Sequence, residues 1–584
     1  MIHDKVVGVL GGGQLGRMLI ESANRLNIQV NVLDVGHAPA KKISHHSKHI
    51  DGSFKERESI QKLAETCDVV TVEIEHVDTH VLEEISDKVD VQPSWRTIRT
   101  IQDKYAQKEH LIKNSVATAK SIPIKTNDVQ GLQDAGKDLG FPFMLKSRTD
   151  AYDGRGNFPV KSEKDFESAL QALGKRPLYA EKWAEFKIEL AVMVVKTKDG
   201  VLAYPVVETV HEDSICKLVY APARGVSTKI RNAARELAKQ AVACFDGKGV
   251  FGVEMFLLQD DSLLINEIAP RPHNSGHYTI EACPTSQYSA HLRAICDLPI
   301  TQASLELRQP SIMLNILGGA DPKSHLEIAE KALAVDNAEV HLYDKGDARP
   351  GRKMGHITIT APTISQAQSL IAPLISAVDA QRAARLNLPS PSPSTAPSDA
   401  TASAPRVVPR VAVIMGSHSD LPVLVPGLEL LKTLQIPHVA RITSAHRTPN
   451  HMSSFVSTLP TTHPSVDIII AAAGGAAHLP GMAASHTTLP VIGVPIKPTI
   501  GDGYDSLVSM TNMPNGVPVA TVGVNRSVNA ALLAARCLAV GDERLRERLE
   551  EWVGKNEEAS LGRDRELEGR GWEAMVGVWY PGGK

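Results

Sequence analysis

A stretch of low-complexity sequence divides this chain and limits how it can fold. Residues 386–409 read LNLPSPSPSTAPSDATASAPRVVP, a composition dominated by Pro, Ser, Ala and Thr that cannot build a core. The segment favours extended, solvated backbone and is predicted to be a linker. The 584-residue chain must therefore form a large N-terminal region and a smaller C-terminal region that fold separately.

The composition restricts the classes of function. Hydrophobic residues make up 42% and charged residues 22% of the chain, which is typical of globular proteins and excludes global disorder. The formal net charge of −3 provides no basic field that would draw the chain onto nucleic acid or an anionic membrane. We therefore expect small-molecule substrates as partners, and neither nucleic acid nor a membrane.

The expected compartment is the cytoplasm. The six cysteines are scattered and form no CxxC pair, which indicates a reducing environment. The first residues, MIHDKVVGVL, lack the basic leader and cleavage site of a secretory signal and are predicted to form a strand. No apolar stretch approaches the roughly 20 residues that a membrane helix requires.

Alternating strand and helix patterns predict a doubly wound α/β domain over residues 1–101. A buried-strand run at residues 6–10 leads into the glycines of residues 11–16, and a helical pattern follows. Strand runs at residues 29–33 and 68–72 continue the alternation.

The rest of the chain is predicted to form three further structured segments. Residues 102–300 mix helices with strands in an α+β domain, and residues 301–385 form a smaller β-rich domain. Beyond the linker, residues 410–541 are predicted to be a three-layer α/β domain with a parallel sheet. The charged tail, residues 542–584, is expected to be a solvated helix without chemistry. The strand runs of the C-terminal domain are at residues 410–415, 467–472 and 491–494.

The first glycine-rich loop, GGGQLG from Gly11, is of a kind that often holds phosphates. Glycine lets backbone N–H groups approach an anion at a helix N-terminus. The motif alone is weak, because a nicotinamide-binding loop and a purely structural turn have the same pattern.

A second phosphate-binding pattern occurs in the α+β domain. The sequence FPFMLKSRTDAYDGRGN places Lys146 at the end of a strand and follows it with a glycine-broken loop at residues 151–157. Lys104 offers a second cation, while Glu181 and Glu189 offer acceptors for a ribose or a base. Each of these side chains alone fits an ordinary surface position, but together they favour nucleotide binding.

Two acidic residues are predicted to face each other in a hairpin. The sequence GVEMFLLQDDSLLINEI contains two apolar runs, and a turn at Asp260 and Asp261 leaves Glu254 and Glu267 equidistant from its centre. Directly paired residues have Cβ atoms roughly 5 Å apart, so the carboxylates would repel each other unless a cation lies between them. Mg²⁺ is commonly held by one or two carboxylates and the phosphates of a substrate. The alternatives are a solvent-facing acidic pair and a different register, since Asp-Asp is not a favoured turn.

Five motifs together resemble the ATP-grasp carboxylases of purine biosynthesis, the carboxyaminoimidazole ribonucleotide synthases. They are GGGQLGRML, VEIEHV, AYDGRGN, NEIAPRPHNSGH and RPGRKMGH, and the resemblance covers residues 1 to about 380. It implies an ATP-grasp fold in which ATP phosphorylates bicarbonate. Carboxyphosphate, or the CO₂ it releases, then carboxylates the exocyclic amine of aminoimidazole ribonucleotide. Mg²⁺ or Mn²⁺ would accompany ATP, and no biotin is expected.

This resemblance implies roles for particular residues. Glu254 and Glu267 would bind the metal, and Arg271 would neutralise bicarbonate or carboxyphosphate during catalysis. The residues implied in ATP binding are Lys104, Lys146, Ala151, Tyr152, Asp153, Gly154, Arg155, Gly156, Asn157, Glu181, Lys182, Trp183, Ala184, Glu189, His211 and Asn266. Those implied in ribonucleotide binding are Gln14, Leu15, Glu73, Asp153 and a basic cluster suited to a 5′-phosphate, Lys345, Arg352 and Lys353.

The C-terminal domain has polar residues where its predicted strands end. VAVIMGSHSDLPVL is a strand, a turn and a helix, so Ser417 and nearby amides can meet a phosphate. Asp420 suits ribose hydroxyls, or it is a plain N-terminal helix residue. ITSAHRTP leaves Ser444, His446 and Arg447 in a carboxyl-end loop, where open parallel sheets bind ligands. Histidine can exchange protons near neutrality, although a lone histidine is more often structural.

A third loop, AAAGGAAHLPGMAA, has almost no polar side chains. Backbone donors within an apolar wall suit CO₂ and favour its loss and recapture. With GSHSD, SAHRTP and LPVIGVP, this loop resembles the aminoimidazole ribonucleotide carboxylase/mutase family over residues 410 to about 540. The resemblance implies that Ser417, Asp420 and Arg447 hold the ribonucleotide and that His446 moves the ring proton. Ser444, Gly474 and Gly475 would line the carboxyl pocket.

The two halves in one chain resemble the fungal-type bifunctional phosphoribosylaminoimidazole carboxylases. The first half would carboxylate the exocyclic nitrogen and the second would move the carboxyl to the ring carbon. The resemblance also implies a homo-oligomer, with an octamer formed by the C-terminal domain. Two alternatives stay open: a C-terminal half that uses CO₂ directly beside an inactive or regulatory ATP-grasp half, and a nucleotide sensor without turnover.

Overall fold

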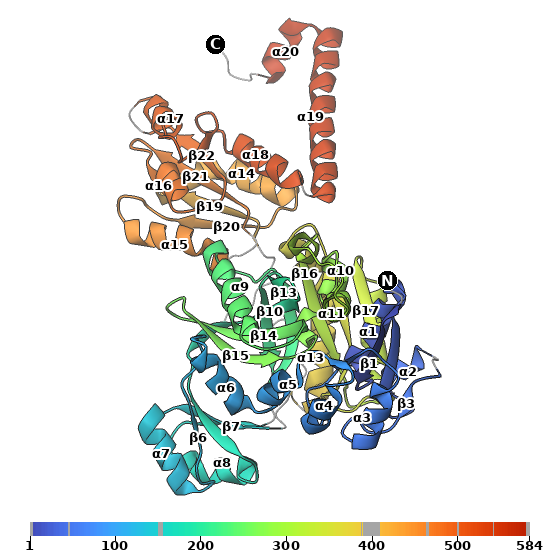
Figure 1. Ribbon diagram of the computed structural model, residues 1–584. Coiled ribbons are helices and arrows are strands. Elements are labelled where there is room, and N and C mark those ends of the chain that lie inside the picture. The colour runs from blue at the N-terminus through green and yellow to red at the C-terminus, as the bar shows by residue number, and fades with distance from the viewer. Residues whose placement is uncertain are drawn as a thin grey trace. The chain divides into compact units, whose positions relative to one another are not determined.

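A computed structural model (Figure 1) describes residues 4–44, 47–149, 156–386, 388, 409–462, 466–498, 501–540 and 542–579. The chain forms two compact units, residues 1–398 and 399–584. None of the helices in these described ranges combines the length and apolar character needed to cross a membrane.

The chain begins with a parallel five-stranded sheet in the order β3-β2-β1-β4-β5. Its apolar strands are buried between helices, as expected of a doubly wound domain. The first helix begins after the glycine loop and ends at Asn27, whose left-handed backbone (φ 52°) stops it. The strands are β1 (Val6–Leu10), β2 (Gln29–Asp34), β3 (Ile50–Asp51), β4 (Val69–Val72) and β5 (Asp90–Val91). The helices are α1 (Gln14–Leu26), α2 (Pro39–Lys42), α3 (Arg57–Ala64), α4 (Thr79–Ile85) and α5 (Trp95–Gln102).

A nine-stranded sheet forms the centre of the first unit. Its order is β15-β14-β10-β12-β13-β16-β18-β17, and β11 pairs with β10. The strands of residues 301–385 extend this sheet, because β13 pairs with β16. The strands are β10 (Phe186–Thr197), β11 (Gly200–Ala203), β12 (Val207–Glu212), β13 (Ile215–Ala221), β14 (Gly249–Leu258), β15 (Leu263–Ala269), β16 (Ser311–Leu317), β17 (Ala338–Leu342) and β18 (Lys353–Thr360). The helices are α6 (Lys104–Lys113), α9 (Thr228–Ala243), α10 (Thr279–Ala282), α11 (Gln287–Ile295), α12 (Ser324–Leu333) and α13 (Ile364–Leu386).

A smaller antiparallel sheet in the order β6-β9-β7-β8 completes the first unit. Two helices pack on it around the buried side chains of Phe143, Leu145 and Phe166. The elements are β6 (Ser121–Pro123), α7 (Val129–Leu139), β7 (Phe143–Ser147), β8 (Asn157–Val160), α8 (Phe166–Leu173) and β9 (Leu178–Lys182). Residues 183–185 join β9 to β10 and so connect the small sheet to the large one.

The second unit has the predicted three layers. Its parallel sheet has the order β20-β19-β21-β22-β23, with one apolar core on each face. Helices α14 and α18 cover one face, and α15, α16 and α17 cover the other. The three predicted strands differ from β19, β21 and β22 by at most two residues at either end. The elements are β19 (Val411–Met415), α14 (Leu421–Thr433), β20 (His438–Ile442), α15 (Pro449–Thr462), β21 (Ile468–Gly474), α16 (Leu479–Ser485), β22 (Val491–Ile496), α17 (Tyr504–Thr511), β23 (Ala520–Thr521) and α18 (Ser527–Ala539).

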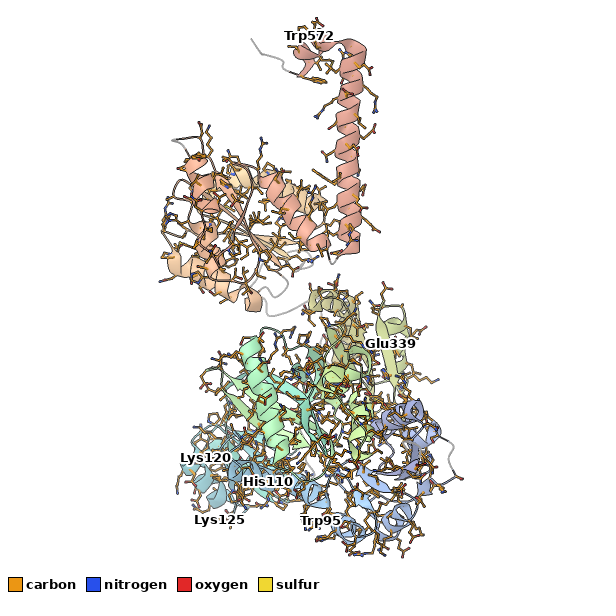
Figure 2. The ribbon with its side chains drawn as sticks, turned by 45° about the horizontal axis from the view of Figure 1, so that its top comes forward. Trp95, His110, Lys120, Lys125, Glu339 and Trp572 are labelled. Carbon is orange, nitrogen blue, oxygen red and sulfur yellow. The ribbon has the colours of Figure 1, made fainter. Side chains whose placement is uncertain are left out.

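The charged tail is helical, as expected. It forms α19 (Glu543–Arg570) and α20 (Trp572–Trp579). Leu545 and Leu549 join the core of the second unit, whereas most later residues are exposed, including Trp572 (Figure 2).

Histidine burial makes the first unit sensitive to acid. His291 on α11 is fully buried, accepts a hydrogen bond at Nδ1 from the Val250 amide (3.0 Å) and contacts the Thr71 hydroxyl through Nε2 (2.8 Å). Burial lowers its pKa to about 3. The unfolded chain therefore binds a proton below about pH 6.5 that the folded chain does not, so stability falls as pH is lowered from 6.5 towards 3.

We expect His291→Gln to reduce this acid sensitivity. For one such histidine, the free energy of unfolding falls by ~1.4 kcal/mol for each pH unit below about 6.5, which is ~2 kcal/mol between pH 6.5 and 5. Glutamine retains a donor and an acceptor but does not titrate. Denaturant unfolding of the first unit at both pH values measures the difference. An equal decrease in the free energy of unfolding of wild type and variant would contradict the prediction.

Candidate active sites

The glycine loop after β1 is filled by a carboxyl group of the chain itself. The Glu73 carboxylate accepts hydrogen bonds from the amides of Gly13 (2.6 Å) and Leu15 (2.9 Å) at the start of α1. A Cβ atom at Gly13 would lie 2.6 Å from Glu73 Oε1, so any side chain at this position would displace Glu73 from the loop. In this structure a carboxyl group of the chain occupies these amides, which favours the structural-turn interpretation of the loop.

The loop of the acidic hairpin is one residue longer than the predicted turn at Asp260 and Asp261, so that turn is wrong. The Leu258 amide donates to Ser262, so the loop has three residues, with Asp261 in the left-handed conformation (φ 67°). On this register alone Asn266 would face Glu254. A β-bulge between the Glu254–Glu267 and Met255–Ile265 pairs absorbs one residue. The direct pairing of Glu254 with Glu267 is thereby confirmed.

The burial pattern shows what the bulge does. Ile265 and Ile268 are both fully buried in the core, three positions apart, whereas a regular strand alternates its faces every residue. The two residues between them, Asn266 and Glu267, both remain partly exposed. A single bulge thus directs two consecutive polar side chains away from the core.

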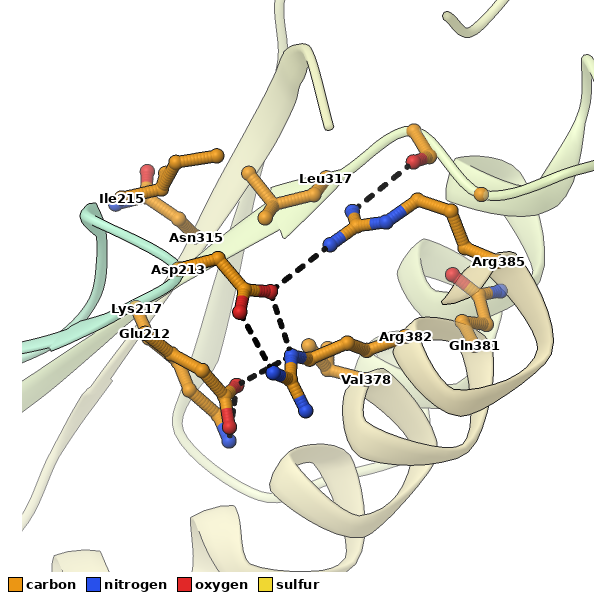
Figure 3. A pocket seen from close by; sticks show the side chains of 12 residues that line it. Glu212, Asp213, Ile215, Lys217, Asn315, Leu317, Val378, Gln381, Arg382 and Arg385 are labelled. Carbon is orange, nitrogen blue, oxygen red and sulfur yellow. Dashed lines mark hydrogen bonds and ion pairs between the residues drawn. The ribbon is translucent and has the colours of Figure 1, made fainter. Parts of the chain in front are cut away.

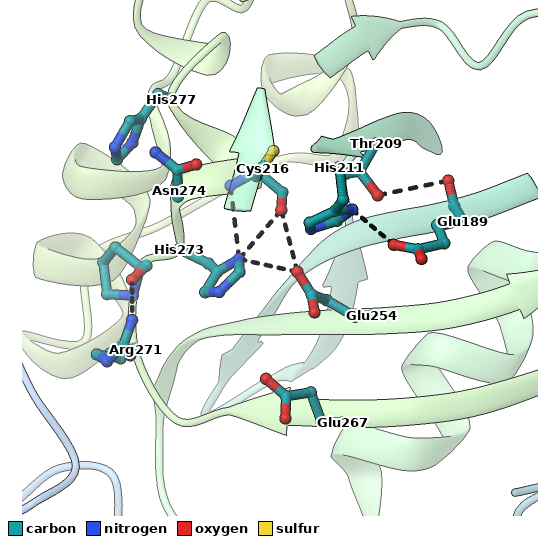
Figure 4. Close-up of polar contacts among 12 residues, drawn as sticks. Glu189, Thr209, His211, Cys216, Glu254, Glu267, Arg271, His273, Asn274 and His277 are labelled. Carbon is teal, nitrogen blue, oxygen red and sulfur yellow. Dashed lines mark hydrogen bonds and ion pairs between the residues drawn. The ribbon is translucent and has the colours of Figure 1, made fainter. Parts of the chain in front are cut away.

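The two carboxylates have different electrostatic surroundings (Figure 4). Burial and the charge of Glu267 raise the pKa of Glu254 to about 7. Burial also opposes ionisation of Glu267, but Lys104, with Nζ 3.3 Å from Oε2, and Lys146 outweigh it and lower the pKa. Among the described residues no group of three or more His, Cys, Asp or Glu side chains forms a metal cage. Two opposed carboxylates near lysines instead fit a Mg²⁺ ion shared with phosphates.

The predicted ATP lysines both lie near Glu267. Lys146 on β7 has Nζ 2.8 Å from Glu181 Oε1 and 3.4 Å from Asn266 Oδ1. Glu181 on β9 is buried by the chain, and its second oxygen lies 2.9 Å from Lys108. Glu181 is therefore first a partner of two lysines, a role that its sequence context did not reveal.

His211 and Glu189 form a pair on adjacent strands, with Nδ1 and Oε2 2.6 Å apart. Burial disfavours the imidazolium, but the Glu189 carboxylate outweighs this and raises the pKa of His211. Lys182, Trp183 and Ala184 lie at the junction between the two sheets, where Trp183 is exposed. Gly156 and Asn157 lie at the start of β8 beside Lys146. Ala151, Tyr152, Asp153, Gly154 and Arg155 lie outside the described residues.

The hairpin that carries His211 is fastened to α13 (Figure 3). Arg382 makes a bidentate ion pair with Asp213 at 2.8 and 2.7 Å, and Arg385 lies 3.6 Å from the same carboxylate. Lys217 pairs with both Glu212 and Asp379 of α13. These contacts restrain the strand ends next to His211.

Arg271 is held by a partner that the sequence reading missed. Its Nε donates to Glu75 Oε2 at 2.6 Å, and the charges of Arg271 and Lys104 overcome burial to hold the pKa of Glu75 far below its usual range. His273 lies 3.7 Å from Glu254. Burial and Arg271 lower the pKa of His273 to about 3, so this imidazole is neutral and the contact is not an ion pair.

The predicted ribonucleotide cluster assembles near the glycine loop. Lys345 donates to the Gln14 side chain and, at 2.9 Å, to the backbone oxygen of Lys353. Arg352 reaches the Lys345 carbonyl at 3.4 Å. Residues from the two ends of the first unit thus meet at one basic surface.

In the second unit, Asp420 accepts a hydrogen bond from the backbone at the start of a helix. Its carboxylate accepts the Ser417 amide at 2.9 Å, and the Ser417 hydroxyl completes a capping box at the helix start. Burial raises the pKa of Asp420, although the Ser417 amide opposes this. Asp420 was predicted either to bind ribose hydroxyls or to be a plain residue at a helix N-terminus, and its contacts in the structure are those of the second kind.

The three carboxyl-end loops meet at one edge of the sheet. His446 follows β20 and His478 follows β21, yet His446 Nε2 and His478 Nδ1 are 2.9 Å apart, although β19 lies between the two strands. The Ser444 hydroxyl accepts the Arg447 amide at 3.2 Å. Both histidines are exposed.

The glycine loop after β21 is held by a serine that the sequence reading missed. Ser506 Oγ accepts the Gly475 amide (2.9 Å) and donates to the Ile496 carbonyl (2.9 Å). Gly475 has φ 66°, which favours glycine, and Gly474 approaches the Ile496 backbone. No role was predicted from the sequence for His478 either, which lies in the loop AAAGGAAHLPGMAA. The proline two residues later indicates a helix start, and this was the signal that could have placed His478 at the carboxyl-end edge.

The chain matches four domain families in sequence order. Residues 4–102 match the ribonucleotide synthetase preATP-grasp domain, residues 109–288 the ATP-grasp domain and residues 311–370 the phosphoribosylaminoimidazole carboxylase C-terminal domain. Residues 410–559 match the AIR carboxylase family. Fold and sites thus define an ATP-grasp protein joined to an AIR carboxylase domain.

Individual relatives specify the family. Phosphoribosylaminoimidazole carboxylase of Saccharomyces cerevisiae is 49% identical over 98% of this chain and 100% of its own length. The carboxyaminoimidazole ribonucleotide synthase of Aspergillus clavatus, solved in complex with ATP, is 65% identical with a TM-score of 0.64, covering 65% of this chain and 100% of that one. A second structure of that enzyme contains ADP and 5-aminoimidazole ribonucleotide. The chain belongs to the phosphoribosylaminoimidazole carboxylase family.

Proposed function

We propose that this chain carboxylates 5-aminoimidazole ribonucleotide in two steps of purine biosynthesis. The first unit uses ATP and bicarbonate to carboxylate the exocyclic amine, and the second unit transfers the carboxyl to the ring carbon. The observation that carries the proposal is the presence of two complementary sites in one chain. One has opposed carboxylates flanked by lysines, and the other has a histidine at a carboxyl-end sheet edge.

In the first site, Lys104 and Lys146 bind the phosphates of ATP, and Glu189 with His211 contacts the nucleoside. Glu254 and Glu267 would hold Mg²⁺, which supplies charge neutralisation at the phosphates when bound. Arg271, fixed by Glu75 at 2.6 Å, faces bicarbonate and the carboxyphosphate made from it. Biotin has no part in this reaction.

The ribonucleotide binds beside the glycine loop. Lys345, Arg352 and Lys353 take its 5′-phosphate, and Gln14 lies next to this cluster through its contact with Lys345. Glu73 holds the loop in shape from within through the Gly13 and Leu15 amides.

In the second site, His446 removes the ring proton after the carboxyl has joined the ring carbon. Ser417 and Arg447 bind the ribonucleotide, and Asp420 keeps Ser417 in place. Ser444, Gly474 and Gly475 surround the carboxyl group, where few polar side chains compete for it. His478, 2.9 Å from His446, orients the imidazole.

We further propose a cytoplasmic homo-oligomer, with an octamer built through the second unit. The six cysteines are free thiols, which suits a reducing compartment.

The test compares product formation with and without ATP at low bicarbonate. Wild-type protein receives 5-aminoimidazole ribonucleotide, and both ADP and the ring-carboxylated product are measured. We expect one ADP for each product and little product without ATP. Equal product without ATP would replace this mechanism with direct CO₂ addition, and binding without turnover would indicate a sensor.

A further inference from the structure

A buried lysine lies behind the nucleotide site. Lys108 is on α6, which also carries His110 (Figure 2), and its side chain is 2% exposed. Its ammonium lies 2.9 Å from Glu181 Oε2, 2.8 Å from Thr118 Oγ1 and 3.1 Å from the Ile265 carbonyl. An ammonium has three protons, so these three acceptors use all of them and leave none for a ligand.

The three acceptors come from different parts of the first unit. Glu181 is on β9 of the small sheet, while Ile265 is on β15 of the large sheet, immediately before the bulged residue Asn266. Thr118 forms a bridge with Ile265 and donates its hydroxyl proton to the same carbonyl at 2.7 Å. Lys108 therefore ties the small sheet to the strand that carries Glu267.

The charges around Glu181 also depend on Lys108. Glu181 accepts one ammonium on each oxygen, Lys146 at 2.8 Å and Lys108 at 2.9 Å. Burial would raise the pKa of Glu181, but the two lysines together lower it to about 2. The carboxylate is therefore ionised. Burial lowers the pKa of Lys108, and the Glu181 carboxylate 2.9 Å away opposes this. With both lysines protonated, the group of three carries a net charge of about +1.

We propose that Lys108 is a positioning residue that keeps the positive charge of Lys146 available to phosphate. By neutralising Glu181 from the buried side, it prevents Lys146 and Glu181 from forming a closed neutral pair. This inference rests on the proposed binding of ATP phosphates by Lys146. Without Lys108, the local charge falls by one, and phosphate binding weakens more than binding of the nucleoside part.

The test measures binding of ATP and adenosine by calorimetry to full-length wild type and to Lys108→Met, which keeps the length of the side chain. We expect ATP to bind 10- to 100-fold more weakly and adenosine less than threefold more weakly. Lys113→Met, on the exposed end of the same helix, is the matched control and should change neither. Unchanged ATP binding, or equal weakening of ATP and adenosine, would overturn the proposal.

A second variant keeps the test decisive if Lys108→Met does not fold. The double variant Lys108→Met/Glu181→Gln removes a buried ion pair without changing the net charge and leaves Lys146 without a competing carboxylate. We expect its ratio of ATP to adenosine affinity to return to within threefold of wild type. A ratio that stays tenfold low would refute the role of charge. Failure of wild type itself to bind ATP would instead refute the proposed function.

Discussion

Replacing Glu267 by glutamine should reduce ATP-dependent carboxylation by about 10³-fold while leaving the protein folded, since preorganised charge at a transferring phosphoryl group is commonly worth this much. Glutamine has the same shape but one fewer charge, so it weakens metal binding and also relieves repulsion from Glu254. The loss should appear in ADP formation measured with saturating ATP, bicarbonate and ribonucleotide. The second unit should still convert N5-carboxyaminoimidazole ribonucleotide supplied from outside.

The matched control is Glu339→Gln, an exposed carboxylate on β17 of the same sheet. It should leave ADP formation unchanged. Melting temperatures of both variants separate lost chemistry from lost structure. A Glu267→Gln protein that forms ADP within tenfold of the wild-type rate would remove Glu267 from the metal site.

His446→Asn should abolish the second step and spare the first. General acid–base catalysis by one side chain typically contributes 10²–10⁴-fold, so we expect about 10³-fold less ring-carboxylated product. ADP should form at the wild-type rate, and exocyclic carboxylated ribonucleotide should accumulate before it decomposes. Labelled bicarbonate followed by carbon NMR distinguishes nitrogen-bound from carbon-bound carboxyl.

The control for this variant is His438→Asn on β20, whose imidazole contacts the Ile436 carbonyl at 3.0 Å, before the carboxyl-end loop. It should retain both steps. If His446→Asn still makes the ring-carboxylated product at more than a tenth of the wild-type rate, another group moves the ring proton.

Local periodicity predicted the α/β and α+β classes of the domains, whereas the ATP-grasp fold was implied by the resemblance of the motifs. The predicted strand runs at residues 6–10 and 29–33 are mostly apolar, and the strands of the structure, Val6–Leu10 and Gln29–Asp34, differ from them by at most one residue. The resemblance implied that His446 and the loop after β21 share one site, and their contact in the structure fits the rule that carboxyl ends of parallel strands lie at one edge of a sheet.

Contacts between distant segments were not predictable in this way. Arg271 pairs with Glu75 across 196 residues, and Lys108 reaches Ile265 across 157. Glu73 fills the glycine loop from 60 residues away. A single sequence contains no periodic signal for such pairs, since they depend on how separate elements pack. The acidic hairpin was predicted with the right pair but the wrong turn, because the bulge at Asn266 compensates for a third loop residue.

That bulge leaves a recognisable pattern in the sequence of β15. A regular strand that aimed two polar groups at one cleft would have to space them as N-x-E, with an apolar residue between. Here the letters are adjacent, INEI, and the flanking isoleucines both point inward. An adjacent polar pair between apolar residues three positions apart can therefore indicate a bulged strand in a sequence without an alignment.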